Sequence, residues 1–568
     1  MVTLSFLADD EDVDLQHALE SSLIDSTCEP IGINLNDSYA NFNKIEEYMK
    51  SIEGEFIDIL TNGSTKSTDD LEFLKSMTSE VTLNNKNHEF LYLSPKDMTY
   101  NPSCDEELSN LSTSEVLELL NIVFGSTRPL AQAEDIRRWL LHSFELNAQK
   151  NTNICNKGES IISNNSLNML FGKMNFCLVQ QYGGPCGILS PIQGYMLKQI
   201  IFRSGTLCNA RDLLNYMDNI DEETCWRVFI EALCIILYQS SLSSTYKVIQ
   251  LKSNLASLWE ENSMYIRKFE SIIDVYQFYL KRCRKGIFSR RGSLLSFLFS
   301  VIATRGVDTI QSEVDMIDNP LIGLYGHCSQ ELVNLMIVGK AVSNVFDGTK
   351  VLDEDGYGTL ILRGIPKRSI IGYLTEHEAF QYCTVGFHYK YPLLPIWIIG
   401  NKNHYRCSFS FSYEECILSP SEQLNQILMK SFQIYDKDNS GFIMDTQVES
   451  YLSSINMPEF HSVLKENISG GILLWSDLKT LIFDNLNIPL DDSDIRRLPC
   501  TLYVFDCQVN KGTTLICATL LDLKDYSVIH KDGNITKKKT ADELDLVSIL
   551  QTRWGSDAVF KTSLINLT

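Results

Sequence analysis

The sequence lacks the cysteine pairs that zinc ribbons and disulfide frameworks require. Its 16 cysteines are scattered over 568 residues, and no two of them form a Cys-x-x-Cys pair. We therefore expect no metal site and no other cofactor. Most of the cysteines should be reduced residues of the core.

Long apolar runs are also missing. No run approaches the roughly 18 residues that a membrane-spanning helix needs, and residues 1–10 lack the basic start of a signal peptide. We expect a protein without a membrane partner that works in the cytoplasm, the nucleus or both.

Positively charged residues are few, and the excess of acidic over basic residues is unevenly distributed along the chain. The net charge is −23, and residues 1–110 hold about 23 acidic and 6 basic side chains. The basic residues at 281–285 and 290–291 form a local patch, which we interpret as solvated surface. Nothing resembles a dense basic stripe, so we expect no nucleic-acid partner. The acidic, Asn- and Ser-rich segment between about 30 and 110 is typical of disorder.

A glycine loop that runs into an apolar segment of helical spacing is the most informative feature present. Cys186 stands at the junction, where unpaired N–H groups and the helix dipole favour a thiolate. Gly183 and Gly184 allow a substrate to approach the backbone, and the Gln180 amide could turn towards an oxyanion at Cys186. The spacing alone also fits a buried cysteine after a tight turn, because free cysteine is among the most buried residues.

A nucleophilic thiol needs a base, and two of the nine histidines stand where one could lie. His404 follows an apolar strand and a turn at 400–403, so it should lie at the mouth of a hairpin, within reach of a helix start. His327 lies in the Gly-containing loop 325–329 and competes for the role. Sequence spacing favours His404 without excluding His327.

Four blocks in this order resemble the MINDY family of cysteine deubiquitinases. They are residues 180–186 with 190–193, residues 325–327, residues 341–348, and residues 395–400 with His404. The resemblance covers about residues 112–568 and is closest to the subgroup with an EF-hand-like insert after the catalytic histidine. It implies a papain-related α+β fold and cleavage of isopeptide bonds in polyubiquitin, with a preference for lysine-48-linked chains. By this resemblance Cys186 is the nucleophile, His404 the general base and Gln180 the oxyanion donor. The residue that orients His404 stays open among Asn344, Asp347 and Asn403.

A short segment near the N-terminus resembles a ubiquitin-interacting motif. It has an acidic run at residues 9–14, followed by four residues on one stripe of a helix. The small Ala18 allows a close approach to a flat apolar surface of ubiquitin. Such a motif would hold polyubiquitin chains and ubiquitinated proteins near Cys186; an incidental amphipathic helix is the alternative. The stripe consists of Leu15, Ala18, Leu19 and Ser22.

Residues 436–447 look like a calcium loop that has lost ligands. Asp436, Asp438 and Ser440 stand at positions one, three and five, but Gln447 replaces the bidentate glutamate at position twelve and Met444 offers no side-chain oxygen at position nine. A second loop at 467–472 has no carboxylate at its ligand positions. We expect a degenerate EF-hand-like pair with weak or no calcium binding.

The predicted organisation follows from these segments. We expect a motif-like helix at 1–30, an acidic, mostly disordered linker at 31–111, a catalytic core at 112–419, an EF-hand-like pair at 420–490 and C-terminal strands at 491–568 that complete the catalytic domain. The rival functions are a catalytically inactive ubiquitin-binding adaptor and a calcium-regulated scaffold. The missing glutamate weakens the second rival.

Overall fold

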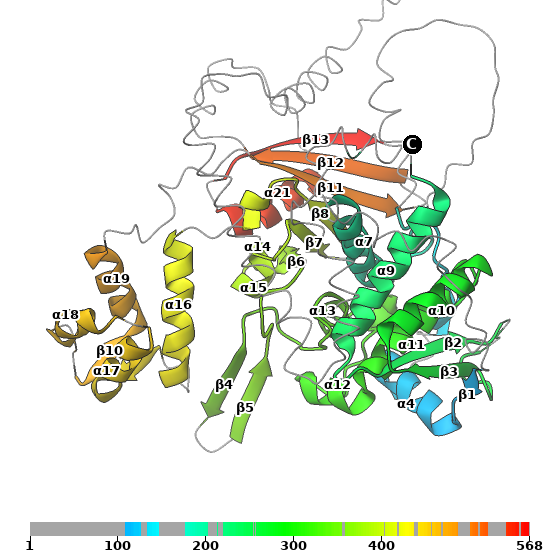
Figure 1. The fold of residues 1–568 in the computed structure, drawn as a ribbon. Helices are drawn as coiled ribbons and strands as arrows, with labels where there is room; N and C mark the ends of the chain where they lie inside the picture. The colour runs from blue at the N-terminus through cyan, green and yellow to red at the C-terminus, as the bar shows by residue number, and fades with distance from the viewer. Residues whose placement is uncertain are drawn as a thin grey trace, which may run out of the picture.

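A computed structural model describes most of the chain beyond residue 107 (Figure 1). The predicted ubiquitin-binding helix, with Leu15, Ala18, Leu19 and Ser22, and the predicted linker up to residue 107 lie outside the described residues. The last four residues of the predicted linker, 108–111, are described, and strand β1 (Ser109–Asn110) lies among them. The described residues are 108–126, 133–146, 177–202, 213, 220–253, 255, 257–354, 358–402, 404–416, 420–436, 441–455, 457–466, 468, 470–486, 500–508, 512–520, 541–555 and 558–566.

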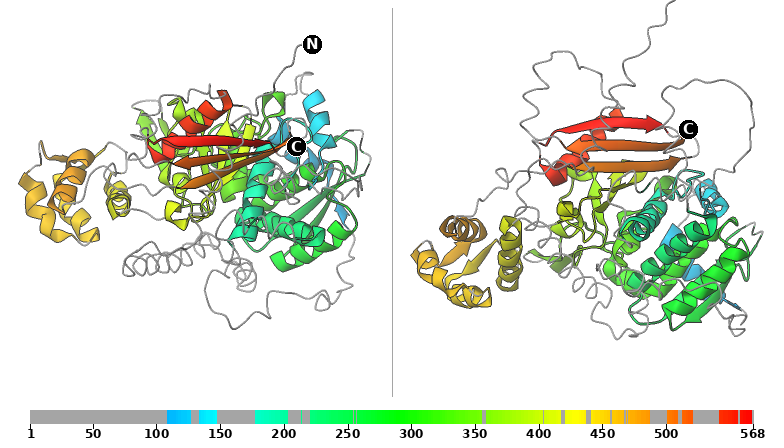
Figure 2. Two further views of the ribbon diagram at one scale, coloured as in Figure 1. Left: turned by 90° about the horizontal axis from the view of Figure 1, so that it is seen from above. Right: turned by 45° about the horizontal axis from the view of Figure 1, so that its top comes forward.

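A six-stranded sheet forms one half of the core (Figures 1 and 2). Its strand order is β13-β12-β11-β8-β7-β6, and every pair is antiparallel except β6 with β7. The strands at the C-terminus of the chain thus lie in the same sheet as β7 and β8. The bounds are Gly372–Thr375 for β6, Ile396–Asn401 for β7, His404–Phe409 for β8, Thr501–Gln508 for β11, Gly512–Leu520 for β12 and Phe560–Asn566 for β13.

Strand β7 is buried on both faces because two separate cores cover the sheet. Ile396 and Ile398 belong to the main core, whereas Trp397 and Ile399 belong to a second core. This alternation is the one that successive residues of a strand must show. Helix α7 (Cys186–Ile201) packs on the main-core face, and helix α21 (Ala541–Trp554) contributes Leu546, Ile549 and Leu550 to the second core.

Helices surround α7 on its remaining sides. Every residue of α7 is buried, as expected for an apolar helix at the centre of a domain. Helix α9 (Glu222–Ser240) and helix α13 (Gln330–Val338) pack directly on it. At Gly194 a Cβ would stand only 3.1 Å from Ile371 Cδ1 and 3.3 Å from Ile398 Cδ1. Glycine therefore lets α7 lie close to the sheet.

A smaller sheet and its helices complete this half. The strand order is β1-β3-β2, and α11 packs against β2. The elements are β1 (Ser109–Asn110), α4 (Thr113–Phe124), α5 (Ala133–Leu141), β2 (Tyr246–Leu251), β3 (Met264–Phe269), α10 (Ile272–Arg284), α11 (Ser293–Arg305), α12 (Val307–Glu313), β4 (Thr349–Glu354), β5 (Gly358–Arg363), α14 (Glu376–Ala379) and α15 (Phe387–Lys390).

Among the described residues no single helix is long and apolar enough to span a membrane; α11 and α12, bent by 79°, reach that length and composition only as a pair.

Residues 420–485 form a unit with its own core, beside the six-stranded sheet in Figure 2. Two similar halves each place a short strand between helices, and β9 pairs antiparallel with β10 through Ile443 and Leu473. The separate core allows this unit to fold largely on its own contacts. The elements are α16 (Pro420–Tyr435), β9 (Phe442–Met444), α17 (Asp445–Ser454), α18 (His461–Glu466), β10 (Ile472–Leu474) and α19 (Trp475–Asn485).

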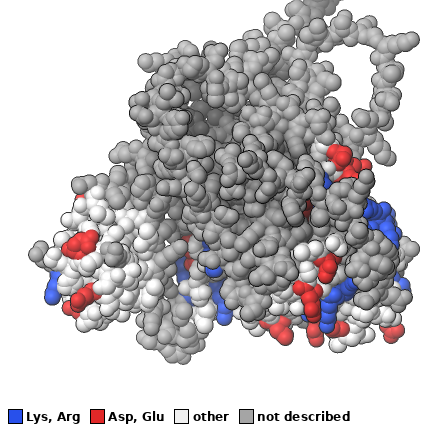
Figure 3. All heavy atoms as spheres, viewed as in Figure 1, with Lys and Arg blue, Asp and Glu red and all other residues white. Residues whose placement is uncertain are grey.

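The mixture of helices and a largely antiparallel sheet is the α+β class that the sequence predicts. On the face seen in Figure 3, Lys and Arg side chains lie among Asp and Glu side chains over the described surface.

Candidate active site

Cys186 is the first residue of α7, as the sequence predicts. Its N-cap is Pro185, whose side chain cannot accept a hydrogen bond, so no side chain caps this helix end. The Cys186 thiol is buried, and its Sγ lies 4.0 Å from Gly184 O. The thiol therefore lies at the positive end of a helix, in a loop-to-helix junction that excludes most water.

The two glycines before Cys186 have different environments. Gly184 has φ +123°, and a Cβ there would stand 2.7 Å from Gly326 O and 3.2 Å from Trp139 Nε1. Gly183 is exposed, and a Cβ there would meet nothing within 4 Å. The backbone conformation and close packing at position 184 therefore require glycine. At Gly183 the space around the Cβ position is open.

The segment 323–328 holds the glycine loop in place from the other side. Trp139 Nε1 donates to Gly326 O at 2.9 Å, and Cys328 Sγ donates to Gly184 O at 3.4 Å. A Cβ at Gly187 would approach Cys328 Cβ to 2.7 Å, so the first turn of α7 fits against Cys328. Burial raises the pKa of the Cys328 thiol well above its ordinary value. Cys328 is thus a packing residue beside Cys186.

Gln180 closes the glycine loop on itself. Its Nε2 donates to Tyr182 O at 2.9 Å, and its side chain is half-buried. An oxyanion at Cys186 would have to draw this amide away from Tyr182, or share it.

The predicted hairpin that carries His404 is present and adjoins the start of α7. His404 begins β8 and pairs with Asn401 at the end of β7. Ser190 Oγ donates to Tyr405 O at 2.8 Å. Because Ser190 lies one helical turn after Cys186 on the same face of α7, the start of β8 lies beside the first turn of that helix. Burial raises the pKa of the Tyr405 phenol well above its ordinary value, and Cys186 and Cys328 are among the groups that act on it.

The competing histidine lies on the facing loop. His327 is exposed, and its backbone oxygen accepts a hydrogen bond from Gly323 N at 2.9 Å. Its neighbour Gly326 contacts Gly184. The structure therefore brings the loops of both histidines to the Cys186 region, with His404 half-buried and His327 exposed.

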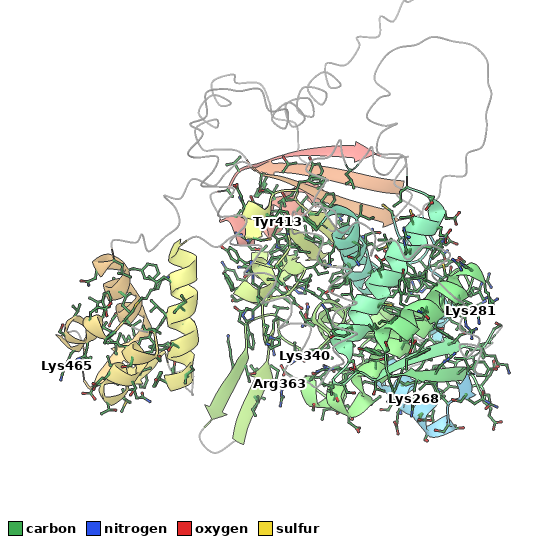
Figure 4. The ribbon with its side chains drawn as sticks, viewed as in Figure 1. Lys268, Lys281, Lys340, Arg363, Tyr413 and Lys465 are labelled. Carbon is green, nitrogen blue, oxygen red and sulfur yellow. The ribbon has the colours of Figure 1, made fainter. Side chains whose placement is uncertain are left out.

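The residues considered for orienting His404 have other partners. Asn344 Nδ2 donates to Asp315 Oδ2 at 2.7 Å and to Arg363 O at 3.1 Å, at the point where β5 joins the core (Figure 4). Asp347 accepts hydrogen bonds from Phe387 N at 2.8 Å and His388 N at 2.9 Å. Asn403 lies outside the described residues.

A buried carboxylate that sequence reasoning missed supports the His404 turn. Glu376 Oε2 accepts a hydrogen bond from Lys402 N, two residues before His404. Glu376 follows β6, whose last residue Thr375 pairs with Gly400. Only the parallel pairing of β6 with β7 brings Glu376 here, and no local pattern in the sequence indicates it.

A second missed residue, His142, lies behind the glycine loop. Its ring packs edge-on against Tyr182 at 5.4 Å and Trp139 at 6.2 Å between centroids. Burial, aided by Arg138, lowers the pKa of His142 to about 4. Its Nε2 has no hydrogen-bond partner within the described structure. His142 is therefore a neutral packing residue at neutral pH.

Two non-glycine residues in left-handed backbone conformations lie near the site. Tyr325 has φ 63° and ψ 13°, and Gln381 has φ 63°. The third such residue in the described part of the chain, Asn262, is of a type that tolerates this conformation. For a tyrosine the conformation costs roughly 1–2 kcal/mol. Strain of this kind clusters at functional sites.

No metal site emerges from the described residues, which contain no group of three or more His, Cys, Asp or Glu side chains able to hold an ion. The fold and the site together define an α+β protein with a cysteine-centred candidate active site.

Comparison with known proteins assigns the family. Residues 155–444 match the model of the conserved domain of deubiquitinating enzyme MINDY-3/4, and this chain belongs to that family of deubiquitinating enzymes. It is 30% identical to the human ubiquitin carboxyl-terminal hydrolase MINDY-3 over 330 residues, which cover 52% of this chain and 72% of the relative.

Other relatives agree with this assignment. The chain is 31% identical to the probable ubiquitin carboxyl-terminal hydrolase MINDY-4 of Xenopus tropicalis over 395 residues, 66% of this chain and 50% of the relative. It is 26% identical to the MINDY-3 homolog of Drosophila melanogaster over 450 residues, 66% of this chain and 74% of the relative. No solved structure matches the chain.

Proposed function

We propose that this chain hydrolyses isopeptide bonds in polyubiquitin, with lysine-48-linked chains preferred, on a papain-related catalytic core. The observation that carries the proposal is the meeting of two predicted segments. Cys186 begins a buried helix, and Ser190, one helical turn later, donates through Oγ to the backbone oxygen of the residue after His404. A thiol and an imidazole on these two backbones are the parts that acyl transfer requires.

In the proposed mechanism the Cys186 thiolate attacks the carbonyl carbon of the C-terminal glycine of ubiquitin. The Gln180 amide and the Cys186 N–H stabilise the oxyanion. His404 protonates the leaving lysine amine, and a thioester with Cys186 results. His404 then removes a proton from water, which attacks the thioester and releases ubiquitin.

The nucleophile is tested with a matched pair of thiol variants. Cys186→Ala should abolish cleavage of lysine-48-linked chains. Cys328→Ser should keep cleaving, because serine retains a donor to Gly184 O and the Cys328 thiol is buried with a raised pKa. Cleavage by purified Cys186→Ala would overturn the proposal. A panel of differently linked chains, digested in parallel by the wild-type protein, tests the linkage preference.

The base is tested with the two histidines. His404→Ala should lower kcat by roughly 10²- to 10⁴-fold, as expected for loss of a general acid–base group. His327→Ala should lose far less. The opposite order would transfer the role to His327.

We further propose that residues 1–30 bind ubiquitin through Leu15, Ala18, Leu19 and Ser22. The acidic run and the helical stripe in the sequence support this proposal. Titration of a peptide of these residues into isotope-labelled ubiquitin should shift resonances on an apolar face of ubiquitin. The absence of any shift at millimolar peptide would reject the motif.

We also propose that residues 420–485 are an EF-hand-like pair that binds calcium weakly or not at all. The paired strands β9 and β10 support the likeness. Gln447 Oε1 accepts a hydrogen bond from Met444 N at 2.9 Å, so this side chain caps α17. Calorimetry that gave a micromolar affinity for calcium would contradict the proposal.

A further inference from the structure

Two exposed aromatic loops flank the candidate active site, one beside each of its segments. The first is Leu324 and Tyr325, next to the glycine loop. The second is Phe380 to Tyr382, which follows α14. Tyr325 is 75% exposed and Tyr382 is 78% exposed. Exposed apolar side chains that gather on a surface mark candidate sites of partner contact, and tyrosine is enriched among the residues that contribute most to binding.

The Tyr325 loop is attached directly to the loop that precedes Cys186. Gly326 O lies 2.7 Å from the position that a Cβ of Gly184 would take, and Trp139 Nε1 donates to the same oxygen. Arg138 Nη2 lies 3.5 Å from Tyr325 O. Tyr182, 47% exposed, directly precedes the two glycines in the chain. The segment that carries Tyr325 therefore adjoins the glycine loop over which a substrate would approach Cys186.

The Tyr382 loop is attached to the turn that leads to His404. Glu376, the first residue of α14, accepts a hydrogen bond from Lys402 N. Tyr382 N donates to His377 O at 2.8 Å, and the rings of Tyr382 and His377 lie 6.3 Å apart between centroids. Phe380 and Tyr382 therefore follow directly on the helix that supports the His404 turn.

Both loops contain a strained residue. Tyr325 and Gln381 adopt left-handed backbone conformations, which glycine would adopt without strain. Tyr325 O accepts from Arg138 Nη2 at 3.5 Å, and Gln381 N donates to Glu378 O in α14 at 2.9 Å. A fold that keeps an exposed tyrosine at such a position loses stability by doing so, which favours a role in substrate contact.

We propose that the two loops contact different ubiquitin units of one polyubiquitin chain. This assignment rests on the proposed function. Tyr325 contacts the glycine-terminated tail of the ubiquitin that forms the thioester with Cys186. Phe380 and Tyr382 contact the ubiquitin that departs with its lysine, because His404, which protonates that lysine, lies on their side.

Two substrates separate the two roles. A single ubiquitin with a C-terminal electrophile occupies only the site of the ubiquitin that bonds to Cys186. A lysine-48-linked diubiquitin occupies that site and the site of the ubiquitin that departs. Tyr325→Gly should slow labelling of Cys186 about tenfold and lower kcat/KM for diubiquitin by a similar factor. Its melting temperature should equal or exceed that of the wild type, because glycine relieves the strain.

Tyr382→Ala should raise KM for diubiquitin about tenfold with little change in kcat, as loss of a remote contact does. Its effect on labelling should be at least fivefold smaller than its effect on diubiquitin cleavage. Met444→Ala is the matched control: Met444 is 50% exposed, in the separate unit around β9, and its loss should change neither rate.

Labelling of Tyr325→Gly within twofold of wild type, or a lowered melting temperature, would overturn the role of Tyr325. Equal losses of labelling and cleavage in Tyr382→Ala would overturn the role of Tyr382. A wild-type protein that reacts with neither substrate would count against the proposed function itself.

Discussion

At the scale of single residues, Cys186 owes its place to its neighbours. Gly184 allows the loop to lie against Gly326, and Gly187 allows the first turn of α7 to lie against Cys328. The sequence predicts the helix start at Cys186 from the spacing of apolar residues. It could not predict that Cys328 and Trp139 hold the loop, because these contacts join residues about 140 to 190 positions apart.

Gln180 provides the first residue-scale prediction. Gln180→Ala should lower kcat by roughly 10²- to 10³-fold, as expected for loss of one oxyanion donor. Gln181→Ala is the control, because Gln181 Nε2 points to Ser143 Oγ at 3.5 Å and is not assigned to the oxyanion. The measurement is steady-state cleavage of diubiquitin, with melting temperatures to confirm folding. Equal rates for the two variants would remove Gln180 from the mechanism.

His142 provides a pH-dependent prediction. Its pKa is about 4 in the folded protein and about 6.5 when unfolded. Between these values the unfolded state binds the extra proton, so stability falls as pH drops from about 6.5 to 4. A pKa shift of this size corresponds to about 3 kcal/mol.

His142→Leu removes this group, so the free energy of unfolding of the variant should fall less over the same pH range. Urea unfolding of both proteins at pH 7 and pH 4.5 measures the difference. Parallel pH dependence in the two proteins would show that His142 titrates normally.

At the scale of elements, the site lies where a helix start meets a hairpin. The sequence predicts both elements, since apolar periodicity marks α7 and an apolar strand before a Gly- and Asn-containing turn marks β7 and β8. It does not predict the contact of α14 with that turn. Glu376 reaches Lys402 through the parallel pairing of β6 with β7, and such pairing leaves no local pattern.

The glycine loop gives an element-scale prediction. Gly184→Ala should lower the free energy of unfolding by roughly 1–3 kcal/mol, because alanine is strained at φ +123° and meets Gly326 O. Gly183→Ala, with open space around it, should stay within about 0.5 kcal/mol of wild type. Chemical denaturation of both variants tests this difference. Equal destabilisation would contradict the described loop geometry.

At the scale of the whole molecule, two cores share the six-stranded sheet and a third core belongs to residues 420–485. The C-terminal strands extend the sheet beyond β8, and α21 covers Trp397 and Ile399. The sequence predicts that strands between residues 491 and 568 join the catalytic domain. It does not predict strand order, because order depends on packing between distant segments.

Two truncated variants test whether residues 420–485 form a separate unit and whether residues 500–568 belong to the catalytic domain. Replacement of residues 420–485 by a flexible Gly/Ser linker should leave a folded protein that still reacts at Cys186. Removal of residues 500–568 should give an insoluble or unfolded protein, because it exposes the edge of β8 and the apolar face of β7. Solubility and thermal unfolding measure both outcomes. A stable, active protein without residues 500–568 would contradict the shared core.

The most direct test of the account is the reaction of the full-length protein with ubiquitin that carries a C-terminal electrophile, followed by peptide mapping of the adduct. We predict one ubiquitin per chain, attached to Cys186, with no adduct in Cys186→Ala and slow reaction in His404→Ala. An adduct on another cysteine, or none at all while lysine-48-linked chains are still cleaved, would contradict the assignment of Cys186 as the nucleophile.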